Sequence, residues 1–255
     1  MRFKLATALY SLSTLYALFT LSACSLAEQA PTTAVQHQKD DCVILVHGLA
    51  RTQRSMQPMQ DALSAEGYRV INHSYPSRKQ TIAQLAKTLN KPIAACKKTL
   101  APNAKIHFVT HSLGGILLRA YIKATPLTEI GRVVMLGPPN QGSEVVDTLK
   151  NVPGFEILNG PAGQELGTSE TALPKTLGPV NFELGVIAGT RTVNPVLSQM
   201  LPSPNDGKVS VESTKVEGMK QHITVEASHT FMMRNKKVVS EVKQFIATGS
   251  FNKYK

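Results

Sequence analysis

The chain of 255 residues contains no tryptophan, and aromatic residues make up only 5% of it. Blocks of one charge are also missing: the formal net charge is +11, but the basic residues are scattered and form no run longer than pairs such as Lys97-Lys98. Nucleic-acid sites concentrate positive charge in one patch or run, so we expect no nucleic-acid partner. With 42% hydrophobic and 18% charged residues, the composition is typical of a folded globular protein and argues against disorder or several membrane spans.

Long hydrophobic runs are scarce as well. The longest, Leu5–Thr20, follows a short basic start, is diluted by Ser and Thr, and is short for a transmembrane helix. It leads into Leu21-Ser22-Ala23-Cys24, which resembles the lipobox of bacterial lipoproteins, where cleavage precedes the cysteine and its sulfur receives a diacylglycerol. We therefore interpret residues 1–23 as a lipoprotein signal peptide and Cys24 as the lipidation site. An ordinary secretory signal beside a chance cysteine is the alternative.

Residues 24–40 are polar and predict a tether between a lipid anchor and a folded domain at 41–250. Ser25 stands where such lipoproteins often carry an aspartate that retains them in the inner membrane, so the outer membrane is the expected location. Without the lipid, the protein is expected to be periplasmic or secreted.

Cysteine is rare, and Cys42 and Cys96 remain once Cys24 is assigned to the anchor. In an exported protein an even pair is a disulfide candidate, whereas in the cytosol the same residues would be two buried thiols. The prediction of a disulfide therefore depends on the signal peptide.

From residue 40 onward, continuous apolar runs alternate with segments of helical spacing. This alternation predicts one α/β domain, in which a mostly parallel sheet carries helices on both faces. Pro92 is expected to kink or divide the second of the helices. Strands are expected at 42–46, 68–71, 106–110, 132–136, 182–188 and 222–227, and helices at 55–66, 82–96, 113–124 and 231–247.

The segment 137–181 breaks this alternation, because it is rich in Gly, Pro, Asn and Ser and has one short helical pattern near 144–149. An irregular segment of this length is often a lid or a binding loop. We expect either that its apolar side chains line an acyl groove or that they pack a small satellite core. They are Val145, Val146, Leu149, Val152, Phe155, Ile157, Leu158 and Leu166.

Ser112 lies where the predicted strand 106–110 turns into the helix that starts at Leu113. A strand–turn–helix of this kind can hold a nucleophilic serine above the sheet, with the positive end of the helix dipole behind it. Gly114 supplies one of the small residues that the turn needs, but Thr110 stands where the G-x-S-x-G pattern has its first glycine. The alternative is that Ser112 only caps the helix.

Two further segments supply groups that a serine hydrolase needs. His47-Gly48-Leu49 ends the first strand, so the backbone N–H groups of Leu49 and Leu113 could converge on one substrate oxygen as an oxyanion hole. Asp206 lies in an Asn-Asp-Gly turn after the next-to-last strand, where a plain surface turn is the alternative.

His229 is the predicted base because it follows the last strand at the carboxyl edge of the sheet, where ligands bind in open α/β sheets. His222, its rival, starts the same strand and would lie roughly 23 Å away. We expect His111 to point away from the site, His107 to be a satisfied core residue and His47 to shape its loop.

The order Ser112, Asp206, His229 is the order of α/β-hydrolases. The segments VILVHGL, FVTHSLGG, MLGPPNQGS, PNDGKVSVES and SHTFMM resemble those of small single-domain bacterial lipases and esterases with little or no cap. The resemblance covers about residues 41–247, and it implies an α/β-hydrolase fold. It also implies that the strands at 42–46 and 106–110 are neighbours, which favours the Cys42–Cys96 disulfide, and that residues 138–143 line the entrance to the site.

The residues and the resemblance together predict a serine hydrolase of carboxylic esters, with lipid or acyl esters as the expected substrates, that uses a Ser112–His229–Asp206 triad. An acyltransferase with the same triad and a catalytically silent lipoprotein scaffold remain alternatives. The sequence contains no cluster with the spacing of metal ligands and no glycine-rich phosphate loop, so no metal and no cofactor are expected.

Overall fold

A computed structural model describes residues 40–252 of the chain. The predicted signal peptide, Cys24 and all but the last residue of the predicted tether lie outside this range. The sheet has six parallel strands in the order β2-β1-β3-β4-β5-β6. They are β1 (Cys42–Val46), β2 (Arg69–His73), β3 (Ile106–His111), β4 (Ile130–Leu136), β5 (Leu184–Gly189) and β6 (Gln221–Val225).

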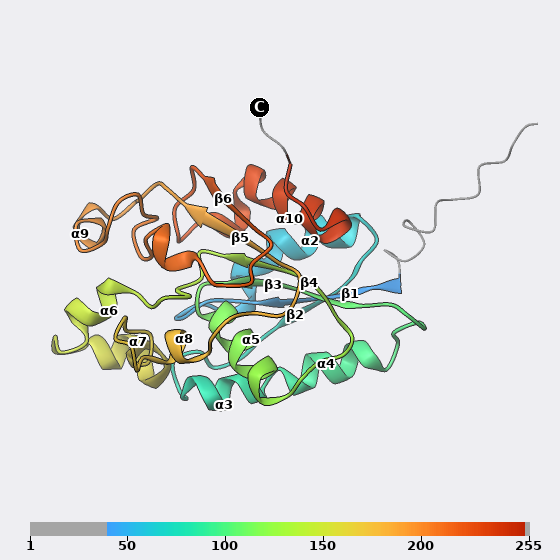
Figure 1. Cartoon of the computed structure of the whole chain (residues 1–255), viewed down its shortest axis with the longest axis horizontal. Coiled ribbons are helices and arrows are strands. Elements are labelled where there is room, and N and C mark those ends of the chain that lie inside the picture. The colour runs from blue at the N-terminus through green and yellow to red at the C-terminus, as the bar shows by residue number, and fades with distance from the viewer. Residues whose placement is uncertain (1–39, 253–255) are drawn as a thin grey trace, which may run out of the picture. The chain divides into compact units, whose positions relative to one another are not determined.

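Helices cover both faces of the sheet, as predicted. Figure 1 shows α2 (Gln57–Ala65) and α10 (Lys236–Thr248) on one face, and α3 (Ile82–Lys87), α4 (Asn90–Lys97) and α5 (Leu113–Ala124) on the other. Each face has its own buried cluster, because the central strands are apolar on both sides: along β1, Ile44 faces one cluster and Leu45 the other. No helix within residues 40–252 is long and apolar enough to cross a membrane.

The segment 137–181 is more regular than expected. It contains the predicted α6 (Glu144–Leu149) and two further helices, α7 (Phe155–Gln164) and α8 (Leu173–Thr176). The periodicity of α7 is hidden because Gly160, which has non-helical backbone angles, and Pro161 divide it into two short pieces. Asp147 ties the segment together by accepting hydrogen bonds from the N–H and hydroxyl groups of Thr168.

The helix expected at 82–96 divides at residues 88–89, as predicted from Pro92, because a proline fits the first turn of α4 but has no N–H to donate to a carbonyl oxygen one turn earlier. Some other boundaries differ from the predictions. Strand β6 ends at Val225, two residues early. Helix α10 begins five residues late, where the Asn235 side chain accepts hydrogen bonds from two backbone N–H groups, and the residues before it form the short helix η3 (Met232–Arg234).

Short helices at 53–56, 195–198 and 212–214 complete the fold. They are η1 (Gln53–Met56), α9 (Pro195–Ser198) and η2 (Glu212–Thr214). Figure 1 shows α6, α7 and α9 at the end of the sheet to which the β6 arrow points. Since all six strands are parallel, their carboxyl ends meet there, and the loops that follow them surround one space.

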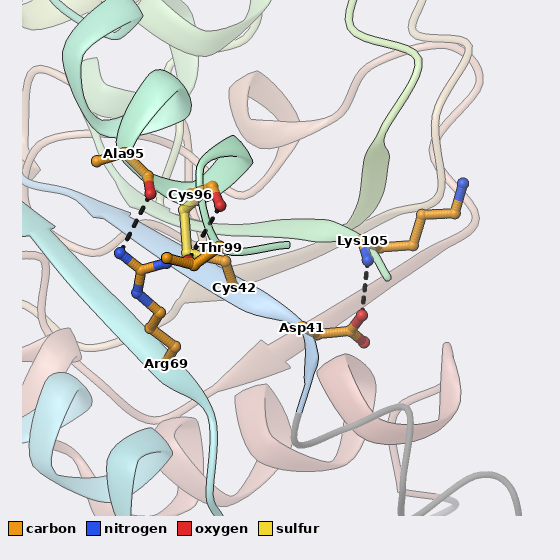
Figure 2. Close-up of a disulfide and its surroundings, with 7 residues drawn as sticks. All are labelled: Asp41, Cys42, Arg69, Ala95, Cys96, Thr99 and Lys105. Atoms are coloured by element: carbon orange, nitrogen blue, oxygen red, sulfur yellow. Dashed lines mark hydrogen bonds between the residues drawn. A yellow bond between two sulfur atoms is a disulfide. The ribbon is translucent and has the colours of Figure 1, made fainter. Parts of the chain in front are cut away.

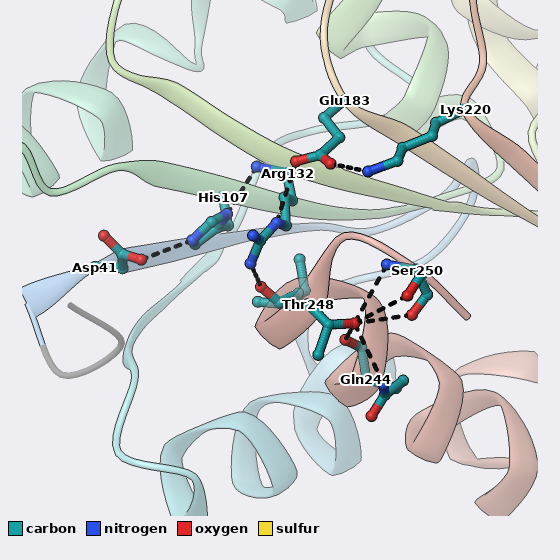
Figure 3. Close-up of polar contacts among 9 residues, drawn as sticks. Asp41, His107, Arg132, Glu183, Lys220, Gln244, Thr248 and Ser250 are labelled. Carbon is teal, nitrogen blue, oxygen red and sulfur yellow. Dashed lines mark hydrogen bonds and ion pairs between the residues drawn. The ribbon is translucent and has the colours of Figure 1, made fainter. Parts of the chain in front are cut away.

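A polar network lies at the other end of the sheet, where the strands begin (Figure 3). The ring of His107 donates to Asp41 at 2.9 Å and accepts the Arg132 N–H at 2.8 Å, so both of its nitrogens are satisfied. The Arg132 side chain continues to Glu183, which also pairs with Lys220. His107 therefore has a structural environment, as predicted.

Cys42 and Cys96 form a disulfide that joins the start of β1 to the end of α4 (Figure 2). Their α-carbons are 5.8 Å apart, and both side chains are buried. Arg69 on the neighbouring strand β2 donates to the carbonyl oxygen of Ala95, so a second contact fixes the end of α4 at this place.

Removal of this disulfide is expected to lower the free energy of unfolding by about 2–4 kcal/mol, because the bond closes a long loop in the unfolded chain. The Cys42→Ala/Cys96→Ala variant and the oxidised wild type can be compared by urea denaturation. Reduced wild type is the matched control and is expected to resemble the variant. Equal stability of the oxidised and reduced wild type would contradict a stabilising disulfide.

Candidate active site

Ser112 occupies a sharp turn between β3 and α5. Its backbone angles, φ 53° and ψ −124°, lie in a region that non-glycine residues seldom adopt. The N–H of Ser112 donates to the carbonyl oxygen of Leu136 on β4, which holds the turn against the sheet. A side chain on Gly114 would place its β-carbon 2.5 Å from the carbonyl oxygen of Val46, so a glycine is required here.

Thr110, which replaces the usual glycine two residues before the nucleophile, fits there because helix α5 leaves room for its side chain. Its side chain is fully buried, and a β-carbon on Gly115 would come within 3.2 Å of its hydroxyl oxygen. The second glycine of the Gly114-Gly115 pair thus accommodates the bulk that Thr110 adds.

The structure brings Ser112, His229 and Asp206 together, although they come from three separate segments. The Ser112 hydroxyl lies 3.0 Å from His229 Nε2, and His229 Nδ1 lies 2.7 Å from Asp206 Oδ2. Because the carboxylate accepts the Nδ1 proton, Nε2 is left as an acceptor for the Ser112 hydroxyl. All three side chains are buried or nearly so.

The Asp206 carboxylate is held by its own turn. Oδ1 accepts the N–H groups of Lys208 and Val209, at 3.0 and 2.9 Å, which leaves Oδ2 directed at His229. The backbone adds a further link, because the His229 N–H donates to the carbonyl oxygen of Asp206. The loop that carries the base is therefore fixed to the turn that carries the acid.

His222, the rival of His229, lies at the start of β6 and bonds Thr214 through Nε2 at 2.8 Å. It does not line the cavity around Ser112.

His111 lies closer to the site than we expected. It lines the same cavity as Ser112, and its ring centre is 4.8 Å from that of His229. Its Nε2–H donates to the carbonyl oxygen of His229 at 3.0 Å. Burial, and then the proximity of His229, holds the pKa of His111 well below its usual value, so the ring is neutral.

The loop after β1 approaches Ser112 from the other side. A β-carbon on Gly48 would lie 3.0 Å from the β-carbon of Ser112, so the backbone before Leu49 touches the nucleophile. Leu113 is the first residue of α5, and its N–H has no partner within the helix. Both predicted oxyanion donors thus come from backbone segments that border Ser112.

His47 and Tyr75 support this loop. Their rings stack with centres 4.1 Å apart, and the Tyr75 hydroxyl donates to the carbonyl oxygen of His47 at 2.5 Å. The His47 ring in turn bonds the carbonyl oxygen of Gly48 at 2.9 Å. His47 shapes its loop, in agreement with the sequence-based expectation.

A cavity of about 250 Å³ opens over Ser112 and His229. Its walls are mostly apolar and include six of the eight side chains that were expected to line an acyl groove, whereas Val152 and Ile157 lie outside it. Pro139 and Ser143, from the segment 138–143, also line it. The six are Val145, Val146, Leu149, Phe155, Leu158 and Leu166.

Other hollows on the described surface lie away from this chemistry. A hollow of about 550 Å³ lies beside His107 and Arg132, near the amino ends of the strands. Residues 40–252 contain no group of three or more His, Cys, Asp or Glu side chains that could hold a metal ion.

Comparison with protein families gives a match to the palmitoyl protein thioesterase family over residues 42–173, just over half of the chain. The chain belongs to this family. The matched stretch includes Ser112 and the loop before Leu49, and it ends before Asp206 and His229. Comparison with curated proteins gave no match.

Solved structures support the same fold. The mature lipase BlEst2 of Bacillus licheniformis is similar with a TM-score of 0.65 and 16% identity, over 88% of this chain and 95% of that one. Lipase B of Aspergillus fumigatus gives a TM-score of 0.63 and 14% identity, over 96% of this chain and 64% of that one. A metagenomic carboxyl esterase, MGS0156, gives a TM-score of 0.57 and 18% identity, over 84% of this chain and 72% of that one. The chain therefore has the predicted α/β-hydrolase fold, and its family supports a hydrolase that acts on esters or thioesters.

Four residues of this thioesterase-family site were not found from the sequence. His111 and Tyr75 act through contacts with the backbone of other loops, which no motif reveals. Arg51 and Lys208 line the cavity, but each is one basic residue among 28 and carries no local signal.

Proposed function

We propose that the protein is a serine hydrolase that cleaves acyl esters through a covalent acyl-enzyme. The observation that carries this proposal is the continuous hydrogen-bond chain from Ser112 through His229 to Asp206. A serine that only capped α5 would need no such partners, and the Ser112 side chain makes no capping hydrogen bond to that helix.

In the proposed reaction, His229 Nε2 takes the Ser112 proton while the hydroxyl oxygen attacks the acyl carbon. The imidazolium that forms is stabilised by Asp206 and then gives the proton to the leaving alcohol as the carbon–oxygen bond breaks. Water, activated by the same histidine, cleaves the acyl-enzyme and releases the carboxylic acid. The N–H groups of Leu49 and Leu113 would stabilise the oxyanion of both tetrahedral intermediates.

The family also supports a thioester substrate, and the triad is chemically suited to either, because the attacked acyl carbon is the same. Hydrolysis of a nitrophenyl ester and of the thioester with the same acyl chain tests the proposal. If neither substrate is cleaved, the proposal is overturned.

The cavity walls support an acyl substrate of medium or greater length. Each buried CH₂ group is worth up to about 0.8 kcal/mol, so kcat/KM is expected to rise from acetyl to longer nitrophenyl esters. A series from two to sixteen carbons measures this rise. A steady fall from acetyl onward would contradict the acyl groove.

Two neighbouring residues of α7 provide a matched pair for this experiment. Leu158 lines the cavity although it is 64% exposed, whereas Ile157 is 83% exposed and does not line it. Leu158→Ala is expected to weaken the preference for longer chains, and Ile157→Ala is expected to leave it unchanged.

We further propose that the enzyme is a lipoprotein of the outer membrane, anchored through Cys24. The support is the resemblance of residues 21–24 to a lipobox, together with the polar residues that follow. The two cysteines that form a disulfide in the folded domain are in keeping with export to an oxidising compartment.

The full-length protein expressed in a bacterial host is therefore expected to begin at Cys24 and to carry the mass of attached acyl chains. Intact-mass measurement of the membrane fraction shows this directly, with Cys24→Ala as the control that should lack the lipid. A mature protein that begins at another residue, or lacks acyl mass, would contradict the anchor.

A further inference from the structure

Two positively charged side chains line the cavity that contains Ser112 and His229. Arg51 lies in the loop between β1 and η1, two residues after Leu49, and is half-buried. Lys208 lies in the turn that carries Asp206, and its side chain reaches solvent. The fold thus brings two cations from distant parts of the sequence to one space beside the nucleophile.

Neither cation has an ion-pair partner among the described residues. Within residues 40–252, the side chains of Arg51 and Lys208 form no ion pair or hydrogen bond, and no Asp or Glu lines the cavity. Asp206 is close to Lys208 in sequence, but both of its oxygens are engaged, one by two backbone N–H groups and the other by His229. The cavity therefore has a surplus of positive charge.

The two charges also act on each other and on the site. Partial burial lowers the pKa of the Lys208 ammonium group, the charge of Arg51 lowers this pKa further, and the nearby Asp206 carboxylate offsets only part of the decrease. The same two cations contribute to the lowered pKa of His111, which contacts His229. Like charges placed together in this way repel, so an anion between them would be favoured.

The apolar walls indicate which part of a substrate would meet these cations. An acyl chain gains by burial against Val145, Leu149 and Leu166, and it offers nothing to an ammonium or guanidinium group. The cations are therefore available to the alcohol side of the ester. A phosphate suits two cations better than a single carboxylate does, because it offers more acceptor oxygens and matches the fork of an arginine.

On the basis of the proposed ester hydrolysis, we infer that Arg51 and Lys208 form an anion subsite that binds a phosphate on the alcohol side of the acyl ester. The substrate class is then an acylated glycerophosphate, as in a phospholipid, in preference to a neutral acylglycerol. The subsite adds selectivity for the leaving group, while the triad performs the same chemistry on both substrates.

A pair of substrates that differ only in the phosphate tests this inference. Release of decanoic acid is measured from monodecanoylglycerol and from monodecanoylglycerol phosphate, both below the concentrations at which they form micelles. The wild type is expected to favour the phosphate ester in kcat/KM by about tenfold or more, since one charge-assisted contact is worth that much. This preference should decrease as salt is added, because exposed charges are screened.

Arg51→Gln and Lys208→Gln are each expected to reduce the preference about fivefold to tenfold, mainly by raising KM for the phosphate ester. Arg54→Gln is the matched control: Arg54 is exposed, lies three residues from Arg51 and does not line the cavity, so the preference should be unchanged. Using the ratio of two substrates cancels any general loss of activity caused by a disturbed loop.

Equal kcat/KM for the two substrates in the wild type, or an unchanged ratio in both variants, would overturn the anion subsite while ester hydrolysis stands. If the wild type cleaves neither these substrates nor nitrophenyl decanoate, the proposed function itself fails and the subsite fails with it.

Discussion

Replacement of Ser112 by alanine is expected to lower kcat/KM for ester hydrolysis by about 10⁴-fold or more, because the attacking oxygen is lost. The fold should persist, since the Ser112 side chain bonds only His229 and its backbone hydrogen bond to Leu136 is kept. Steady-state kinetics with nitrophenyl octanoate, together with the thermal unfolding midpoint, separates these two effects.

An exposed serine on α2 provides the control. Ser64→Ala is expected to leave both activity and stability unchanged. If Ser112→Ala keeps substantial activity while folded, Ser112 is not the nucleophile.

The second large effect separates two histidines. His229→Ala is expected to reduce kcat/KM by about 10⁴-fold, because within residues 40–252 His229 is the residue whose ring nitrogen bonds the Ser112 hydroxyl. His222→Ala is expected to keep most of the activity, since its ring bonds Thr214 and lies outside the cavity. The two variants, assayed side by side with nitrophenyl octanoate, differ only in which histidine is lost.

The opposite pattern, with an inactive His222→Ala and an active His229→Ala, would mean that the base has been misassigned. Circular dichroism of both variants shows whether a loss of activity reflects a loss of structure.

The parallel sheet was predictable because its strands are strongly apolar. Strand β1 appears in the sequence as an uninterrupted run of five residues, Cys42–Val46, all of them buried. Parallel pairing then determines which ends meet, so residues that follow strands, such as Ser112 and His229, could be placed at one edge from chain order alone.

Features that depend on contacts between distant segments were harder to predict. Helix α7 was missed because Gly160 and Pro161 interrupt its periodicity. The need for a glycine at position 160 becomes clear only in the structure, where a β-carbon there would lie 1.9 Å from the carbonyl oxygen of Arg78. His111 was expected to point away, because the direction of a side chain in a tight turn depends on the loops that pack against it.

The central claim, that Ser112 is the activated nucleophile of a hydrolase, is tested most directly by labelling with a fluorophosphonate probe. After incubation of the full-length protein, intact mass and peptide mapping should show one adduct on Ser112. The adduct should be lost in Ser112→Ala and should form much more slowly in His229→Ala, where no base activates the hydroxyl. Absence of labelling, or labelling at another residue, would contradict the account.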